Sequence, residues 1–144
     1  MTQEEIKKIL PHRDKMLLVD EAELCQDSLD ENGQPTRCRG SYTIRGDEWF
    51  LQGHFPGNPI VPGVVQCEII AQASCVLFAE KMQGNTAYYA GIDKVRFRRM
   101  VRPGDTLEIT STLLRSKLNV YVVKGEARVD GQVCASGEFS FIIP

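Results

Sequence analysis

The chain has 144 residues, a formal net charge of -2 at pH 7, 42% hydrophobic residues and 25% charged residues. This length suits one domain with a single core, residues 1–144, and the composition is that of an ordinary globular protein. The small negative charge gives no general reason to expect nucleic acid or an anionic membrane as a partner.

The sequence predicts two helices and six strands. In chain order these are a short helix at 2–10, strands at 15–25 and 36–44, a stiff Gly/Pro loop at 53–63, a long helix at 64–82, and strands at 86–101, 106–115, 120–129 and 132–143. Thr2 and Glu5 have the spacing of a capping box for the first helix. The long helix holds no Gly or Pro until Gly84, and Asp130-Gly131 is typical of a hairpin turn between the last two strands.

The connections between strands are short, which favours antiparallel pairing. The long helix is apolar on nearly every face, so we expect other elements to cover it. A curved antiparallel sheet wrapped around this helix satisfies both demands, which makes the chain an α+β protein. Gln66, Glu68 and Gln72 within the apolar stretch argue against a membrane span.

The N-terminal residues 1–10 are charged and too short of apolar length for a signal peptide. The five cysteines are an odd number and contain no Cys-x-x-Cys pair. We therefore expect reduced thiols in a cytoplasmic protein. With two histidines and no clustered thiols, no structural zinc site is expected.

Glu68 is a candidate general acid. It lies about five residues into an apolar helix, and Gln72 follows on the same face, where its amide can orient the carboxyl group. Burial disfavours the ionised form, so we expect a raised pKa and a carboxyl that keeps its proton at neutral pH. The alternative is that Glu68 reaches solvent near the start of the helix, where the dipole favours negative charge.

His54 is a candidate base. It lies in "GHFPGNPIVPG", residues 53–63, where glycines let the backbone approach a ligand and prolines stiffen the loop. An imidazole is partly neutral at pH 7 and can then accept a proton. The alternative is a loop histidine that hydrogen-bonds its own backbone.

Gly63 is a candidate binding point for a substrate carbonyl. It stands at the start of the long helix, where backbone N–H groups lack partners and the dipole is positive. The alternative is that Gly63 only lets the chain turn. A base, an acid and an oxyanion donor within about fifteen residues suit the elimination of water beside a carbonyl group.

Three stretches resemble one enzyme family: "LPHRDKMLLVD", "GHFPGNPIVPGVVQCEIIAQ" and "IDKVRFRRMVRPGD". The chain is similar over nearly its whole length to the 3-hydroxyacyl-acyl-carrier-protein dehydratases of type II fatty acid synthesis, the FabZ class. The resemblance implies the hot dog fold and the conversion of a (3R)-hydroxyacyl chain on acyl carrier protein to the trans-2-enoyl product. It implies no metal and no cofactor.

The family's catalytic residues fall on His54 and Glu68, and its carbonyl-binding glycine falls on Gly63. The resemblance also implies that the histidine and glutamate of one site come from opposite subunits of a homodimer, and that dimers assemble into hexamers as trimers of dimers.

The tyrosine that gates the acyl tunnel in some members falls on Tyr88; the alternative is a strand residue that packs on the helix. Gly63, Phe55, Gln72 and Tyr88 form the predicted substrate-binding set. Asp14, Lys15, Ile69 and Ile70 depart from common family residues, which affects the expected chain length of the substrate rather than the reaction.

A basic cluster follows in "DKVRFRRMVR". Strand alternation predicts Lys94, Arg96 and Arg98 on one face and Val95 and Phe97 on the other. Arg99 and Arg102 extend this cluster, and the resemblance implies an acidic carrier protein as the partner that it binds. A solvated strand face is the alternative.

Cys67 is expected to be an inert core thiol, and His12 is expected to be structural. Three other functions stay open: a thioesterase in which Glu68 activates water, a non-catalytic acyl-binding regulator, and a dehydratase that also isomerises its enoyl product.

Overall fold

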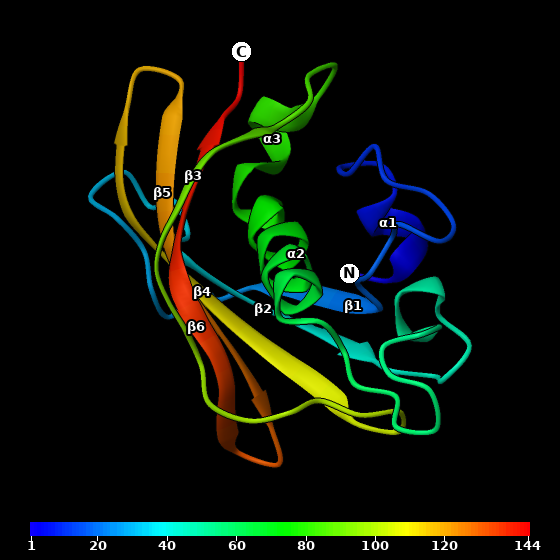
Figure 1. The fold of residues 1–144 in the computed structure, drawn as a ribbon. Helices are drawn as coiled ribbons and strands as arrows, with labels where there is room; N and C mark the ends of the chain where they lie inside the picture. Colours follow the sequence, from blue (N-terminus) through cyan, green and yellow to red (C-terminus); the bar gives the residue numbers. More distant parts are fainter.

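A six-stranded antiparallel sheet curves around one central helix in the computed structural model, which describes all residues from 1 to 144 (Figure 1). The strands are β1 (Glu21–Leu24), β2 (Arg37–Thr43), β3 (Tyr88–Phe97), β4 (Thr106–Lys117), β5 (Val120–Val129) and β6 (Gln132–Ile142). Their order in the sheet is β1-β2-β4-β5-β6-β3, so β1 and β3 are the edges. The predicted α+β, hot dog architecture is confirmed.

The helical elements are α1 (Gln3–Ile6), the 3-10 turn η1 (Trp49–Leu51), α2 (Gly63–Ser74), the 3-10 turn η2 (Cys75–Phe78) and α3 (Ala79–Met82). The predicted capping box is present at α1, since the Thr2 side chain accepts from the Glu5 N–H and the Glu5 carboxylate accepts from the Thr2 N–H.

The predicted long helix is continuous from Gly63 to Met82 but changes geometry after Ser74. The Ser74 hydroxyl donates to the Ile70 carbonyl at 2.7 Å, a bond back along the helix that bends helices at such positions. The helical run Gly63–Met82 is long and apolar enough to cross a membrane, yet 67% of its most apolar stretch is buried inside the fold. The sheet already covers its apolar surface.

Helix α2 packs closely on the concave face of the sheet (Figure 1). At Gly125 on β5, an added Cβ atom would lie 2.4 Å from Cγ2 of Ile70, so only glycine allows this approach. Ile69, Ile70 and Phe139 are fully buried, and Ile70 and Phe139 lie at the contact with Gly125. The central position of α2 therefore follows from a small residue in the sheet and large ones on the helix.

The predicted strand at 15–25 is shorter than expected, since β1 covers only Glu21–Leu24. Residues 17–19 are buried nonetheless. The side chain of Gln72 on the helix, rather than a neighbouring strand, bonds the backbone here. The Leu18 N–H donates to Oε1 of Gln72, and the Met16 carbonyl accepts from Nε2 of Gln72. The segment is held against α2 rather than in the sheet.

Edge strand β3 contains two bulges against β6. Tyr89 pairs with Phe141 and Gly91 with Ser140, which leaves Ala90 as an extra residue. A second extra residue lies between Asp93 and Arg96, where Lys94 has a φ of 54°. Bulges of this kind bend a strand and redirect its side chains.

Candidate active site

His54 is held in the loop by its own backbone neighbours. Its Nδ1 lies 2.8 Å from the Ile60 carbonyl oxygen, and the Ile60 N–H donates to the His54 carbonyl at 2.8 Å. A carbonyl oxygen only accepts, so the contact requires a proton on Nδ1, and in the neutral imidazole Nε2 then carries the free lone pair. The hydrogen bond to loop backbone that the alternative interpretation predicted is therefore present, and it leaves Nε2 without a partner in the loop.

Phe55 stacks on the imidazole of His54, with ring centroids 4.1 Å apart and an interplanar angle of 26°. The Phe55 ring is half-exposed, so it presents an apolar surface beside His54. Hydrogen bonds in both directions between the backbones of Phe55 and Asn58 close the tip of the loop. The predicted contact of Phe55 with substrate stays a prediction.

Gly63 is the first residue of α2, so its N–H has no partner within the helix. An added Cβ atom at Gly63 would lie 2.9 Å from Cε1 and Cζ of Phe97, so the Phe97 ring occupies the space of a side chain. Gly63 lines one hollow with His54. The other residues of that hollow are Ile60, Val61, Pro62, Val64, Gln66, Phe97, Arg98, Arg99 and Met100.

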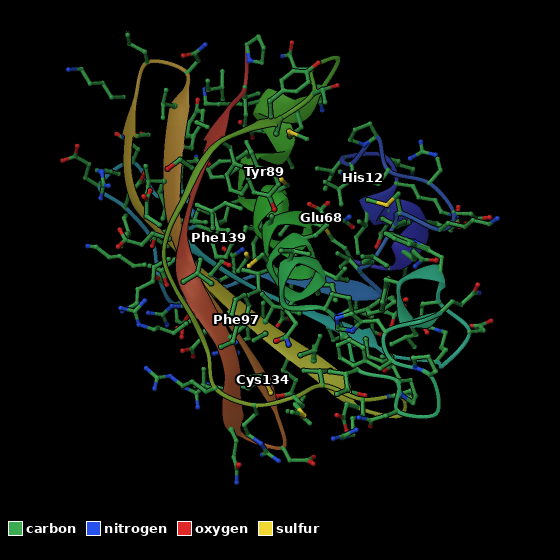
Figure 2. All side chains as sticks on the ribbon, in the orientation of Figure 1. His12, Glu68, Tyr89, Phe97, Cys134 and Phe139 are labelled. Carbon is green, nitrogen blue, oxygen red and sulfur yellow. The ribbon has the colours of Figure 1, made fainter.

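Glu68 lies in the second turn of α2, and three side chains hold its carboxylate (Figure 2). Gln72 donates through Nε2 to Oε2 at 2.8 Å, as the helical spacing predicted. Tyr89 donates through its hydroxyl to Oε1 at 3.2 Å. His12 approaches from the N-terminal segment, with Nε2 3.5 Å from Oε2.

The predicted rise in the pKa of Glu68 is wrong for this chain. Burial does raise the pKa, as expected, but hydrogen bonds from His12, Gln72 and Tyr89 stabilise the ionised form and together hold the pKa below its ordinary value. The prediction counted burial and one amide, and it lacked the two donors that come from distant segments. In the single chain Glu68 is an anchored carboxylate.

His12 and Tyr89 are the site residues that the sequence reasoning missed. Figure 2 shows Glu68 between Tyr89, which comes from β3, and His12, which comes from the segment after α1. Nδ1 of His12 is buried without a hydrogen-bond partner, which leaves Nε2 as its only contact with a polar group of the site. No spacing pattern could reveal them, because they lie 56 and 21 residues from Glu68.

Gln72 is 1% exposed and connects Glu68 to the N-terminal segment. Its Oε1 accepts from Leu18 N–H at 2.8 Å, while its Nε2 donates to both Met16 and Glu68. These three bonds use the amide's donors and one of its acceptor positions. The geometry makes Gln72 an orienting residue for Glu68, and its predicted contact with substrate stays a prediction.

Tyr88 and Tyr89 point to opposite faces of β3, because successive strand residues alternate. Tyr89 pairs with the buried Phe141, with ring centroids 5.7 Å apart, on the face of the helix. Tyr88 pairs with Ile142 and is 59% exposed. The alternative that Tyr88 packs on the helix is therefore wrong, and its role at an acyl tunnel stays a prediction.

His54 and Glu68 make no contact with each other in one chain. His54 bonds to Ile60, whereas the carboxylate of Glu68 bonds to Gln72, Tyr89 and His12. Glu68 does not line the hollow that His54 and Gly63 share. One chain thus places His54 and the Gly63 N–H at one hollow and the Glu68 carboxylate elsewhere.

The basic cluster is less regular than strand alternation predicted, because the second bulge includes Lys94. Lys94 pairs with Glu138 at 3.0 Å, and Arg96 donates to the Val95 carbonyl. The Phe97 ring lies against Gly63 at the start of α2. Arg99 donates to the Gln132 amide oxygen and Arg102 to Asn58, while Arg98 lines the hollow of His54.

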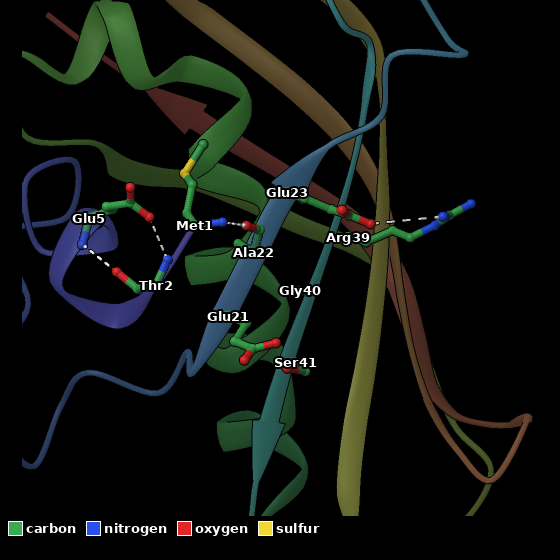
Figure 3. A pocket seen from close by; sticks show the side chains of 9 residues that line it. All are labelled: Met1, Thr2, Glu5, Glu21, Ala22, Glu23, Arg39, Gly40 and Ser41. Carbon is green, nitrogen blue, oxygen red and sulfur yellow. Dashed lines mark hydrogen bonds and ion pairs between the residues drawn. The ribbon is translucent and has the colours of Figure 1, made fainter.

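A second hollow lies beside the chain start, at β1 and β2 (Figure 3). Its polar groups are largely occupied within the chain: the Met1 amine donates to the Ala22 carbonyl, and Thr2 and Glu5 form the capping box. None of the predicted catalytic residues lines it. Cys67 is buried and burial raises its pKa, as expected for an inert thiol.

The chain is similar to dehydratases over nearly its whole length. The model of the FabA-like domain family matches residues 10–138. A 3-hydroxyacyl-acyl-carrier-protein dehydratase FabZ from Oenococcus oeni is 44% identical over 146 aligned positions, 99% of each chain. A FabZ protein from Lactobacillus helveticus is 42% identical, over 97% of this chain and 91% of its own. One from Enterococcus faecalis is 40% identical, over 99% of this chain and 98% of its own.

Solved structures share the fold at lower identity. The dehydratase heterocomplex ApeI:P from Xenorhabdus doucetiae matches with a TM-score of 0.77 and 21% identity, over 96% of this chain and 90% of that chain. A variant of the fluoroacetyl-CoA-specific thioesterase FlK matches with a TM-score of 0.64 and 14% identity, over 75% of this chain and 84% of that chain. At these identities both matches support the fold alone.

Proposed function

The chain belongs to the FabZ family of 3-hydroxyacyl-acyl-carrier-protein dehydratases, and from this membership we propose that it removes water from a 3-hydroxyacyl thioester on acyl carrier protein during fatty acid elongation. The observation that carries the proposal is the hollow shared by His54 and Gly63, where a free imidazole Nε2 and an unpaired helix N–H lie together. A base beside a carbonyl-binding donor suits removal of the proton next to that carbonyl.

In the proposed reaction, Nε2 of His54 takes the proton from C2 of the substrate. The Gly63 N–H stabilises the negative charge that develops on the thioester oxygen. The bond between C3 and its hydroxyl oxygen breaks, and Glu68 gives that oxygen a proton, so that water leaves and a C2–C3 double bond remains. His54 ends protonated and Glu68 ionised, and transfer of one proton between them through solvent restores the starting state.

We propose that two chains complete each site, with His54 from one subunit and Glu68 from the other. The separation of these residues within one chain supports this arrangement. Edge strand β3 supports it too, since an unpaired edge is ready to pair with a second copy. Exposed apolar side chains lie on or beside it, namely Ile92, Phe97 and Met100. Assembly of such dimers into hexamers is part of the same proposal.

Glu68 must gain a proton before it can serve as the acid. In the single chain its donors hold the carboxylate ionised. A second subunit and a bound acyl chain both remove water from the site, and this added burial acts in the direction that raises a carboxyl pKa. We therefore place the protonated form of Glu68 in the assembled enzyme with substrate bound.

The basic cluster, Lys94, Arg96, Arg98, Arg99 and Arg102, is the proposed docking surface for the carrier protein. All five side chains are exposed, and Arg98 and Arg99 line the hollow of His54. An acidic partner bound there would deliver its thioester arm to the base. The five cysteines are all unpaired and buried, which fits the expected cytoplasmic location.

The test uses a 3-hydroxyacyl thioester and two readouts, the ultraviolet absorbance of the conjugated enoyl thioester and the release of free thiol. Dehydration gives the absorbance without thiol, and His54→Ala or Glu68→Ala should abolish it. Near-normal turnover in either variant would refute the assigned roles.

A mixture of the two inactive variants tests the two-subunit site. If dimers form at random, half are hybrids with one intact site each, so co-expression should restore about a quarter of the wild-type rate. A site built within one chain would give no recovery, because every chain lacks one residue.

A thioesterase is the second candidate, and the ionised state of Glu68 favours it. A carboxylate that is already deprotonated can activate water for attack on the thioester carbonyl. Stoichiometric thiol without enoyl absorbance in the same assay would establish hydrolysis and make Glu68 the base.

A further inference from the structure

The two oxygens of the Glu68 carboxylate are held in different ways. Oε2 faces Gln72 at 2.8 Å and His12 at 3.5 Å. Oε1 accepts one hydrogen bond, from the hydroxyl of Tyr89 at 3.2 Å. Gln72 is 1% exposed, whereas Tyr89 is 43% exposed at the edge of the sheet. Oε2 is therefore the anchored oxygen, and Oε1 is the one that a substrate can approach.

The position of Tyr89 is fixed by its ring. The ring packs on Phe141, its partner across the strand pair, and this contact does not depend on the hydroxyl. The strand bulges at Ala90 directly afterwards, which ends the regular pairing next to Tyr89. The hydroxyl is thus presented to Glu68 by a rigid support and has no other hydrogen-bond partner.

We propose that Tyr89 is a positioning residue for the dehydration, whose hydroxyl holds Oε1 of Glu68 at the place where the substrate's 3-hydroxyl group binds. The inference rests on the proposed function and assigns a role to a residue next to the predicted gate, Tyr88. Tyr89 forms and breaks no covalent bond in it.

The chemistry of the neighbours assigns the acid's proton to Oε1. The Gln72 amide nitrogen only donates, so it favours an unprotonated Oε2. A tyrosine hydroxyl both donates and accepts, so Tyr89 can donate to ionised Oε1 and accept from it once it carries the proton. Oε1 has a second position for a hydrogen bond, so the substrate's 3-hydroxyl group can bind there beside Tyr89.

Loss of the Tyr89 hydroxyl should shift the pH dependence of turnover in a defined direction. The titratable groups around Glu68 are His12 on the N-terminal segment, Tyr89 on β3 and the thiols of Cys67 and Cys75 on the helix. The Tyr89 hydroxyl stabilises ionised Glu68, so its removal raises the pKa of that carboxyl. A general acid works below its pKa, so activity should persist to higher pH in the variant.

The test compares Tyr89→Phe with Tyr88→Phe, the same change on the neighbouring residue of the opposite face. In Tyr89→Phe we expect the alkaline limb of the pH profile of kcat, which reports the enzyme with substrate bound, to move to higher pH. On the acid side, kcat should fall about fivefold from lost orientation. In Tyr88→Phe the limb should stay in place, whatever happens to KM. The inference would be overturned if the alkaline limb lay at the same pH in wild type and Tyr89→Phe. An equal shift of the limb in both variants would also overturn it.

A carbon-13 NMR titration of the Glu68 carboxyl carbon tests the contact without turnover. The midpoint should rise in Tyr89→Phe and stay unchanged in Tyr88→Phe, and an unchanged midpoint in Tyr89→Phe would overturn the inference. Absence of wild-type turnover on every 3-hydroxyacyl thioester would instead overturn the proposed function. The two failures are therefore distinguishable.

Discussion

The contact between Gly63 and Phe97 predicts that Gly63→Ala damages turnover far more than stability. The added methyl carbon would lie 2.9 Å from Cε1 and Cζ of Phe97, well inside ordinary carbon contact of about 3.5 to 4 Å. The ring must therefore retreat by about 0.6 to 1 Å, or the start of α2 must move by that distance. Phe97 is half-exposed at the end of an edge strand, so the ring has room to move outward.

For that reason the free energy of unfolding should fall by only about 1 kcal/mol, the low end of the cost of overpacking. Turnover is more sensitive, because a displacement of about 1 Å in a positioning group can cost about 100-fold in rate. We expect kcat for a 3-hydroxyacyl thioester to drop by about 10- to 100-fold in Gly63→Ala. Denaturant unfolding and the enoyl absorbance assay measure the two effects separately.

The control is the same substitution in a Phe97→Leu background, where a smaller side chain leaves space for the methyl group. Alanine keeps its N–H, so Gly63→Ala should cost at least fivefold less in that background if the clash is the cause. The reasoning is refuted if Gly63→Ala turns over at the wild-type rate, or if the loss is equal in both backgrounds.

Three further predictions concern groups around the site. Gln66 is 3% exposed, and its Oε1 lacks a hydrogen-bond partner. Gln66→Met should therefore raise the free energy of unfolding by about 1 kcal/mol. A lower melting temperature in this variant would show that a second subunit supplies the missing partner. Arg98→Glu should raise KM at least fivefold for carrier-linked substrate but not for a small thioester, with the difference shrinking at high salt; equal effects on both substrates would contradict carrier docking. The lowered pKa of Glu68 means that its contacts stabilise the fold above the ordinary value of 4.5 and lose that effect as pH falls through the folded pKa. The melting temperature of wild type should therefore fall more steeply with acid than that of Glu68→Gln, and parallel curves would contradict this sign.

Local patterns in the sequence predicted what depends on local contacts. The Thr2 capping box, the strand–turn–strand runs of β4 to β6 and the Gln72–Glu68 pair all join residues close in sequence, and each is confirmed. The predicted strand at 15–25 is longer than β1, because Leu18 fits the alternating pattern of a strand. In the structure the Leu18 N–H donates to the Gln72 side chain on the helix instead. A pattern of alternation cannot show such a partner.

The same limit explains the charge state of Glu68. The apolar sequence around Glu68 indicates its burial, which raises the pKa. The net lowering of the pKa also needs donors on the N-terminal segment and on β3, in addition to Gln72. His12 and Tyr89 reach the carboxylate from segments far from it in the sequence, one before β1 and one on β3. The bulge at Lys94, which disturbs the basic cluster, likewise depends on pairing with β6.

The amide of Gln72 ties the backbone of Leu18 to the carboxylate of Glu68, with one bond on each side of the same rigid group. Any movement that swings this side chain away frees the Leu18 N–H to exchange its hydrogen with solvent at the moment it releases the carboxylate. Deuterium uptake at this backbone position therefore reports how often the Gln72 side chain leaves its place between Leu18 and Glu68. This exchange can be measured in the resting protein, without substrate.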